Sequence, residues 1–238
     1  MKNPKILLII PAYNEEANIL RVYNNIVSYN KKANNKLDVV FINDGSKDNT
    51  ENILLENNIN HVKLIQNLGI GGAVQTGYKY AIENNYDIAI QFDGDGQHDI
   101  NYVEDLIKPI LDEEADMTIG SRFIDSSSSD FKSSGMRRLG IKVISLCIRI
   151  RTGKKIYDTT SGFRAVNKKV LDRFAVHYPL EYPEPISSVD VLLKDMKIKE
   201  VPVSMNERIA GKSSIGSWKN VYYMINVTLS ILLRKREK

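Results

Sequence analysis

The segment Asp87-Ile88-Ala89-Ile90-Gln91-Phe92-Asp93-Gly94-Asp95-Gly96-Gln97-His98 decides the fold that we expect for this 238-residue chain. Its first half, Asp87–Phe92, is a short apolar run, and its second half, Asp93–His98, is a polar motif with two aspartates and two glycines. Apolar residues that follow one another without alternation are typical of a strand buried on both faces of a sheet. The segment therefore predicts an interior strand that ends in a polar turn.

Similar apolar runs precede and follow this segment, at Lys5–Ile10, Leu37–Ile42, His61–Ile65 and Met117–Ile119. The stretches between them have helical spacing, and Asp48 or Asn49 can cap a helix over Thr50–Glu56. Strands that alternate with helices predict an α/β fold with a mostly parallel sheet and helices on both faces. Ligands bind at the carboxyl ends of strands in such sheets, and the polar stretches Pro11–Glu16, Asn43–Asp48 and Asp93–Asp99 all follow predicted strands.

The two carboxylates of the polar motif are expected to hold a metal ion. Residues two apart in an extended segment point the same way, so Asp93 and Asp95 face one site and repel each other unless a cation lies between them. Their hard oxygen atoms suit Mg²⁺ or Mn²⁺, which can also bridge a diphosphate. Gly94 and Gly96 let the backbone bend and let phosphates approach. The alternative is a solvated acidic turn.

The other two polar stretches predict contacts to a nucleoside. The carboxylate of Asp44 can accept the imide N–H of uracil, Tyr13 can offer its ring to a base, and Glu15 can accept from ribose hydroxyls. In both stretches a simpler structural interpretation remains open. Asn43–Asp48 can be an ordinary Asp-Gly turn before a helix, and Asn14 can be the cap of a helix that starts in Pro11–Glu16.

Composition and short motifs exclude several protein classes. The chain is 42% hydrophobic and 26% charged with a net charge of +4, as in ordinary globular proteins. A single cysteine, Cys147, excludes a disulfide framework and a cysteine-rich zinc site, and it suits a reducing cytoplasm. We expect no membrane span, because the longest candidate, Val221–Leu233, is short and contains Asn226. Val74 and Asn206 stand where a dinucleotide fingerprint and a P-loop need glycine, which argues against both.

Taken together, the motifs resemble those of family-2 glycosyltransferases of the GT-A fold, and among these the dolichyl- or undecaprenyl-phosphate sugar synthases. The resemblance spans nearly the whole chain, and the last three motifs are those of the polyprenyl-phosphate branch. It is carried by Pro11–Glu15, Asn43–Ser46, Asn67–Gly71, Asp93–His98, Gly120–Phe123, Thr160–Arg164 and Glu207–Arg208 with Gly211–Ser214. Asn43 departs from the pattern, because many relatives carry an aspartate there.

The resemblance implies a role for each group of residues. A Mg²⁺ or Mn²⁺ ion and the donor diphosphate would be held by Asp93, Asp95 and Gln97. The nucleotide sugar would contact Pro11, Ala12, Tyr13, Glu15, Asp44 and Asp93. The acceptor phosphate would be surrounded by Arg122, Arg137, Arg138, Ser161, Arg164, Arg208 and Lys212. Asp95 and Asp158 would be catalytic, with Asp158 removing a proton, aligning the acceptor or supporting Arg164. Cations around the acceptor agree with elementary electrostatics, because two anionic substrates must approach each other.

The same resemblance predicts how residues 1–238 are organised. They would form one GT-A domain, with a nucleotide-sugar half over 1–120 and an acceptor half over 121–215. The basic segment 131–157 carries eight Lys or Arg residues and no acidic residue. Within it, a helix over 136–151 places Lys142, Ser145 and Arg149 on one stripe and Val143, Leu146, Cys147 and Ile150 opposite.

A second amphipathic helix is predicted over 217–235, with Val221, Ile225, Leu229 and Leu232 on one side and Lys219, Asn226 and Ser230 on another. Basic amphipathic helices lie in lipid headgroups, which predicts peripheral binding to the inner face of the cell membrane, with a small membrane protein as a candidate partner. The alternative is that both helices pack on the sheet as core helices. Nucleic-acid binding is not expected, because the basic run is interleaved with apolar residues and no reader motif accompanies it.

The function expected from the sequence is inverting, metal-dependent transfer of a sugar of the glucose or N-acetylglucosamine type. The donor would be a UDP-sugar and the acceptor undecaprenyl phosphate, for bacterial cell-surface polysaccharide. Three alternatives stay open: extension of a glycan at a sugar hydroxyl, a sugar nucleotidyltransferase, and an inactive scaffold that binds a membrane partner. A nucleotidyltransferase would need glycines and a basic residue after the first strand, where the chain has Tyr13-Asn14-Glu15.

Overall fold

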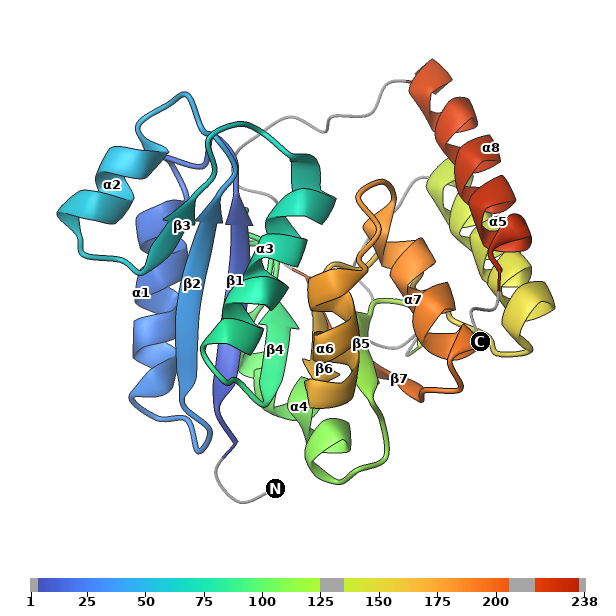
Figure 1. Cartoon of the computed structure of the whole chain (residues 1–238), viewed down its shortest axis with the longest axis horizontal. Coiled ribbons are helices and arrows are strands. Elements are labelled where there is room, and N and C mark those ends of the chain that lie inside the picture. Colours follow the sequence, from blue (N-terminus) through green and yellow to red (C-terminus); the bar gives the residue numbers. More distant parts are fainter. Residues whose placement is uncertain (1–3, 125–134, 206–216, 236–238) are drawn as a thin grey trace.

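The computed structural model describes residues 4–124, 135–205 and 217–235, and it describes the backbone alone for 135–137 and 217–221. One seven-stranded sheet lies at the centre, with the strand order β3-β2-β1-β4-β6-β5-β7 (Figure 1). All pairs are parallel except those of β6, which runs antiparallel to both of its neighbours. The strands are β1 (Ile6–Ala12), β2 (Leu37–Asn43), β3 (His61–Lys63), β4 (Ile88–Gln91), β5 (Met117–Ser121), β6 (Arg164–Asn167) and β7 (Ile198–Pro202).

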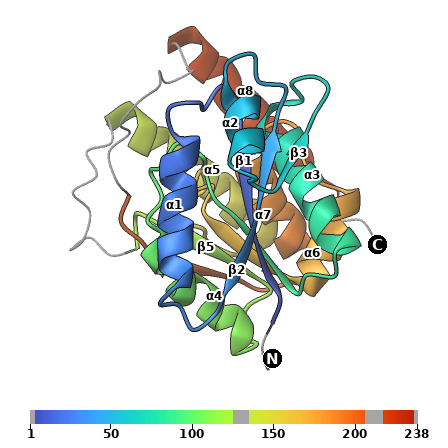
Figure 2. The ribbon, with the colours of Figure 1, turned by 90° about the vertical axis from the view of Figure 1, so that its left-hand side faces the viewer.

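Helices cover both faces of this sheet (Figure 2). Alternate residues of β1 show why, because Leu7 and Ile9 belong to the hydrophobic core on one face and Leu8 and Ile10 to the core on the other. The first core is closed by α3 (Gly69–Glu83), α5 (Gly135–Thr152), α6 (Lys168–Val176), α7 (Pro183–Leu193) and α8 (Ser217–Leu233). The second is closed by α1 (Ile19–Asn30), α2 (Thr50–Glu56), the 3₁₀ turn η1 (Ile100–Tyr102) and α4 (Val103–Leu111).

Strand register brings the carboxyl ends of four parallel strands to one edge of the sheet. Ala12 is level with Asn43, and Ile9 is level with Gln91. Across the antiparallel β6, both Gln91 and Ile119 are level with Arg164. The ends of β4 and β5 are therefore two strand spacings apart, about 10 Å. All residues that immediately follow β1, β2, β4 and β5 consequently meet at this edge.

The predicted α/β architecture is confirmed, with local differences. The strand predicted over His61–Ile65 ends at Lys63, and Ile65 is fully exposed. The cap of α2 comes from Asp48, whose Oδ1 accepts the N–H of Thr50, while the side chain of Asn49 makes no cap bond. Asn14 caps no helix, because α1 begins only at Ile19. Strands β6 and β7 carry no strong sequence pattern and were not predicted.

Helices α5 and α8 pack against each other and against α7, at the right of Figure 1. Both run where the two amphipathic helices were expected, but the assignment of sides in α5 was partly wrong. Ser145 and Cys147 are both buried, and the Ser145 hydroxyl donates to the carbonyl of Ile156. Among the described residues, no helix combines the length and the apolar character needed to cross a bilayer.

Candidate active site

The loops that follow β1 and β2 are tied together by backbone-to-side-chain hydrogen bonds. The N–H of Asn14 donates to the Ser46 hydroxyl at 3.0 Å, and the N–H of Lys47 donates back to Oδ1 of Asn14 at 2.8 Å. The N–H of Glu15 donates to the Thr50 hydroxyl at 2.9 Å. Asn14 has a left-handed backbone with φ 56°, which asparagine tolerates better than most residues. The predicted nucleoside residues Pro11 and Ala12 thus end β1, and Tyr13 and Glu15 lie on the braced loop that follows, with Tyr13 exposed.

Asp44 directly follows β2, and its side chain contacts the N-terminal end of α3. Its side chain is 4% exposed, and its Oδ1 accepts the N–H of Leu68 at 2.7 Å. Burial raises the pKa of Asp44, and the backbone N–H groups of Leu68 and Gly69 act against this rise. The next residue must be glycine: Gly45 has φ 68°, and a Cβ there would lie 2.8 Å from the backbone of Asn67. Asp44 is therefore held in place by a helix start, at the edge where its predicted ligand would bind.

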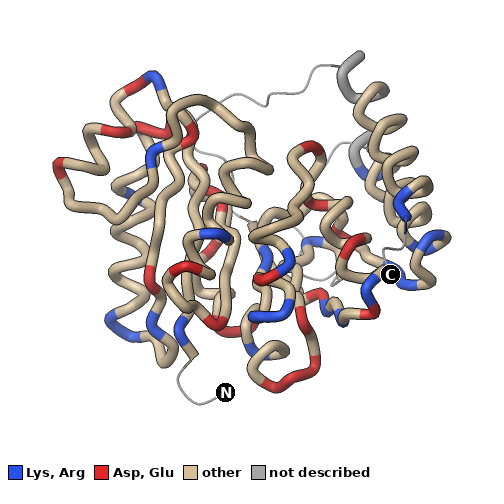
Figure 3. Tube along the Cα trace, in the orientation of Figure 1, with Lys and Arg blue, Asp and Glu red and all other residues tan. Residues whose placement is uncertain are grey.

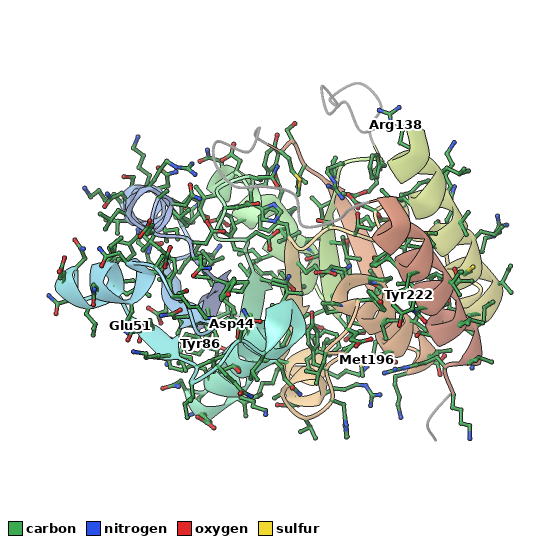
Figure 4. All side chains as sticks on the ribbon, turned by 90° about the horizontal axis from the view of Figure 1, so that it is seen from above. Asp44, Glu51, Tyr86, Arg138, Met196 and Tyr222 are labelled. Carbon is green, nitrogen blue, oxygen red and sulfur yellow. The ribbon has the colours of Figure 1, made fainter. Side chains whose placement is uncertain are left out.

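Asn43, the departure from the family pattern, has a structural partner. It is 1% exposed, its Nδ2 donates to Oε2 of Glu51, and its Oδ1 accepts the N–H of Ser46 at 3.0 Å. An aspartate at this position would place a second carboxylate against Glu51. Figure 4 shows Asp44 and Glu51 on neighbouring elements of this end of the molecule.

Replacing Asn43 with aspartate is therefore expected to lower the free energy of unfolding by about 2–3 kcal/mol at pH 7, because a buried donor is lost and two carboxylates meet. Denaturant unfolding measures the change. In the double variant Asn43→Asp with Glu51→Gln, the glutamine amide supplies a new donor, so most of the loss should be recovered. Equal stability of the two variants would show that the Asn43–Glu51 contact does not matter.

The predicted metal motif follows β4 directly. Asp95 is 7% exposed, and its Oδ1 accepts the N–H of Gln97 at 3.0 Å. Oδ2 of Asp93 lies 3.0 Å from Nε2 of His98, whose ring stacks on Phe163 at 5.0 Å. The backbone approaches this turn closely: a Cβ on Gly94 would lie 2.9 Å from the Pro11 carbonyl, and one on Gly162 would lie 2.9 Å from the Asp93 carboxylate. The motif is packed tightly against the end of β1 and the segment before β6.

The donor set fits a metal shared with a substrate better than a metal held by protein alone. Among the described residues, no group of three or more His, Cys, Asp or Glu side chains is placed to hold an ion. Two carboxylates remain at the end of β4. Mg²⁺ is commonly bound through one or two carboxylates together with substrate phosphates, so Asp93 and Asp95 suit that arrangement. No contact of the Gln97 side chain supports or opposes its predicted role as a third ligand.

Arg122 and Asp158 form a buried ion pair next to β5. Nε and Nη2 of Arg122 each donate to one carboxylate oxygen of Asp158, both at 2.7 Å, and Nη2 also donates to the Thr160 hydroxyl at 2.9 Å. Arg122 is 6% exposed and Asp158 is fully buried. Burial alone would raise the pKa of Asp158, but the hydrogen bonds and charge of Arg122 outweigh it and lower the pKa. Support of Arg164 was one of three roles expected for Asp158, whose carboxylate is paired with Arg122.

One residue links this ion pair to the metal motif. Met205 forms an antiparallel β-bridge with His98, and its Sδ lies 3.7 Å from Nη1 of Arg122. Arg122 and the Asp93–His98 motif are therefore neighbours of the same residue. Met205 immediately precedes 206–216, so the predicted contacts Arg208 and Lys212 lie outside the described residues.

The remaining predicted acceptor residues are placed differently. Ser161 is fully buried and Arg164 is 1% exposed. Nε of Arg164 donates to the Ser161 carbonyl and its Nη1 to the Glu184 carbonyl, both at 2.7 Å, so it fastens the segment before β6 to α7. Arg138 is exposed on α5, far from Asp44 in Figure 4, and the side chain of Arg137 lies outside the described part. Their contact with the acceptor phosphate stays a prediction.

Sequence reasoning missed two residues of this network. Thr160 was noted only as part of a motif, yet its hydroxyl accepts from Arg122. Glu200 on β7 was not considered, although its carboxylate accepts the N–H groups of both Tyr157 and Asp158 at 2.8 Å. A single glutamate in a short strand gives no local signal, because its partners are more than forty residues away in the chain.

Relatives of this chain match it over nearly its whole length. A relative from Methanococcus voltae, UDP-N-acetylglucosamine–dolichyl-phosphate N-acetylglucosaminyltransferase, is 32% identical over all of this chain and 99% of its own length. Undecaprenyl-phosphate mannosyltransferase from Micrococcus luteus is 27% identical over 94% of this chain and 93% of its own length.

Among solved structures, glucosyl-3-phosphoglycerate synthase from Mycobacterium tuberculosis, in complex with Mn²⁺, UDP and glucosyl-3-phosphoglycerate, has a TM-score of 0.70 and 19% identity. The match covers 96% of this chain and 80% of that one, and it shows the GT-A fold. The model of glycosyl transferase family 2 matches residues 7–174. The protein is a glycosyltransferase and belongs to glycosyl transferase family 2.

Proposed function

We propose that this glycosyltransferase moves one sugar from a UDP-sugar to a polyprenyl phosphate at the cytoplasmic face of a membrane, with a divalent metal and with inversion at the anomeric carbon. N-acetylglucosamine and glucose are the sugars to test first. The observation that carries the proposal is the position of Met205, which touches both Arg122 and the turn that contains Asp93 and Asp95. Met205 thus places the cationic Arg122 near the two carboxylates. Transfer between two anionic substrates requires such a cation.

The order of groups along the sheet edge supports a donor that lies across β2, β1 and β4. Asp44 follows β2, Tyr13 follows β1, and Asp93 and Asp95 follow β4. A nucleoside at the first two strands would place its diphosphate beside the carboxylates. When bound there, Mg²⁺ or Mn²⁺ would neutralise the diphosphate and stabilise it as a leaving group. The chain's own part is to fix both carboxylates, through the Gln97 N–H on Asp95 and the His98 ring on Asp93.

The proposed transfer needs no strong base. A phosphate monoester carries about 1.5–2 negative charges near neutral pH, so its oxygen can attack the anomeric carbon directly. A new carbon–oxygen bond forms to the lipid phosphate, and the bond to the UDP oxygen breaks with its electron pair going to UDP. The pKa of Asp158 is lowered, and both of its carboxylate oxygens already accept hydrogen bonds from the Arg122 guanidinium. Both observations agree with a carboxylate that stays ionised. We propose that Asp158 holds Arg122 at the acceptor side, and that it does not remove a proton.

Helices α5 and α8 offer the surface that would meet the membrane. We call the exposed apolar residues of both helices the outer face. Its spacing of three and four residues is that of a helical stripe. It comprises Leu139, Val143, Leu146, Ile150, Tyr222, Ile225, Leu229, Leu232 and Leu233, each between 37% and 75% exposed. The buried residues Ile144, Ile148, Val227 and Ile231 pack inward, so the two helices are docked and still keep this second apolar side.

Charge supports a lipid bilayer as the occupant of the outer face. Neither α5 nor α8 contains an acidic residue, whereas α5 contains two arginines and a lysine after its first turn, Lys142, Arg149 and Arg151 (Figure 3). Each cation near an anionic leaflet contributes about 1 kcal/mol, and apolar stripes with such cations lie at the depth of the headgroups. Two bonds from Arg151 to the Arg234 carbonyl, and the pair Arg234–Asp190 at 2.6 Å, fix the end of α8. The face is thus held rigidly for docking.

The variant with Leu146→Glu and Ile225→Glu is expected to bind anionic phospholipid vesicles at least about tenfold more weakly than the wild type, because two apolar anchors are lost and two like charges are added. Vesicle co-sedimentation measures the partition. Leu55→Glu, on the equally exposed Leu55 of α2, is the matched control and should bind like the wild type. If the wild type forms dimers and the double variant does not, the outer face is instead an interface between two copies of the chain.

The proposed reaction is tested by incubating the purified protein with labelled UDP-N-acetylglucosamine or UDP-glucose and with undecaprenyl or dolichyl phosphate. A labelled glycolipid that forms with Mn²⁺ or Mg²⁺ and disappears with EDTA is expected. Free oligosaccharides and 3-phosphoglycerate serve as competing acceptors. Transfer to a sugar hydroxyl or to the small phosphate, and none to either lipid, would replace the proposed acceptor.

A further inference from the structure

Glu200 lies on β7, the last strand of the sheet, next to β5. It is level with Ile119, two residues before the end of β5 at Ser121. Its backbone therefore lies within the sheet, and its side chain extends toward the segment that follows α5. Glu200 is half-buried there.

The Glu200 carboxylate binds two successive backbone amides. Oε2 accepts the N–H of Tyr157 and Oε1 accepts the N–H of Asp158, each at 2.8 Å. A carboxylate that accepts two amide hydrogens fixes the direction of that peptide segment, because both bonds break if the segment turns. Because Glu200 binds the N–H of Asp158, it fixes the backbone position from which the Asp158 carboxylate reaches Arg122.

The same carboxylate also contacts Ser121, which precedes Arg122 at the end of β5. The Ser121 hydroxyl hydrogen-bonds to Glu200, and the N–H of Phe123 donates to that hydroxyl at 3.5 Å. Ser121 and Phe123 flank Arg122 in the chain. One side chain thus connects the strand end that carries Arg122 with the turn that carries Asp158. Burial raises the pKa of Glu200, and the amides of Tyr157 and Asp158 act against this rise.

We propose that Glu200 is a positioning residue for the acceptor side of the reaction, which aligns Arg122 and Asp158 by holding the backbone on both sides of their ion pair. The proposal rests on the function proposed above. It assigns the residue to the acceptor phosphate, because Arg122 lies at the end of β5 and the donor groups lie across β2, β1 and β4. Loss of Glu200 should therefore affect the acceptor far more than the nucleotide.

Glu200→Ala and Glu200→Gln test this role. We expect KM for polyprenyl phosphate to rise about tenfold or more in Glu200→Ala, with the affinity for UDP and Mn²⁺ within about twofold of the wild type. Glutamine keeps one acceptor oxygen and should recover part of the loss, since each hydrogen bond is worth a factor of about two to ten. Lys199→Ala is the control, because Lys199 precedes Glu200 on β7 and pairs with Glu114 in solvent.

Hydrogen exchange without substrates separates this role from the overall function. In Glu200→Ala the amides of 157–160 should exchange about tenfold faster, and those of 13–18 should not change. If the wild type makes no glycolipid but the exchange result holds, the proposed acceptor fails and the positioning of the ion pair stands. Unchanged exchange and unchanged acceptor KM would overturn the proposal. Equal losses of UDP affinity, acceptor affinity and melting temperature would also overturn it, since they indicate a general structural role.

Discussion

Replacing Asp158 with alanine is expected to abolish transfer and to lower the free energy of unfolding by about 3–5 kcal/mol, because the buried guanidinium of Arg122 loses its partner. Asp158 accepts two hydrogen bonds from that guanidinium and one from the backbone N–H of Arg122 at 3.1 Å. Denaturant unfolding and the transfer assay measure the two losses. Asp172→Ala removes an exposed i,i+4 partner of Lys168 and should change stability by no more than about 0.5 kcal/mol.

The pH dependence of stability distinguishes a paired carboxylate from a base. The pKa of Asp158 is lowered in the folded state, so its contribution is complete above its ordinary value of 3.8 and is lost as the pH falls through the lower folded value. The difference in stability between wild type and Asp158→Asn should therefore be constant from pH 8 down to about pH 4 and shrink below it. A stable Asp158→Asn protein whose kcat falls and loses the acidic limb of the wild-type pH profile would support proton removal instead.

Replacing Asp95 with asparagine is expected to lower turnover by about a hundred- to a thousandfold while the free energy of unfolding stays within about 1 kcal/mol of the wild type. The amide oxygen can still accept the N–H of Gln97, so the turn keeps its shape. What is lost is the charge that would bind the metal. Calorimetry of UDP binding with and without Mn²⁺ should show metal-dependent affinity in the wild type and little in the variant.

Asp105→Asn is the matched control for Asp95→Asn. Asp105 is an exposed aspartate in the first turn of α4, ten residues beyond Asp95, and its replacement changes the net charge by the same amount. It should keep both turnover and the metal-dependent affinity for UDP. If Asp95→Asn keeps the metal effect as well, the carboxylates of this motif do not hold the ion.

The sequence was sufficient for the features that depend on neighbouring residues. The apolar runs of β1, β2 and β4 and the polar turns after them lie within a few residues of each other, so local pattern predicts both. Parallel strands then require that Pro11–Glu16, Asn43–Asp48 and Asp93–Asp99 share an edge. These are the features that the structure reproduces with small changes of boundary.

The features that depend on distant partners could not be predicted from pattern. Arg122 and Asp158 are separated by 36 residues, and both fit equally well as independent ligands in a motif. Arg164 has the residue type of a phosphate ligand, and only the packing of β6 between β4 and β5 shows that it is buried. In α5, helical periodicity placed Ser145 with Lys142 and Arg149, but packing against α7 and α8 buries one side of the helix and leaves a second, apolar side exposed.

The central claim is that three groups bind along one edge of the sheet: the nucleoside at β2 and β1, the metal at β4 and the acceptor phosphate at β5. Crystals soaked with UDP and Mn²⁺ test it most directly, through the anomalous difference map of manganese. The predicted result is a single strong peak between the carboxylates of Asp93 and Asp95, with the uracil ring beside Asp44 and the β-phosphate facing Arg122. A manganese peak away from both aspartates, or UDP bound at another edge of the sheet, would contradict it.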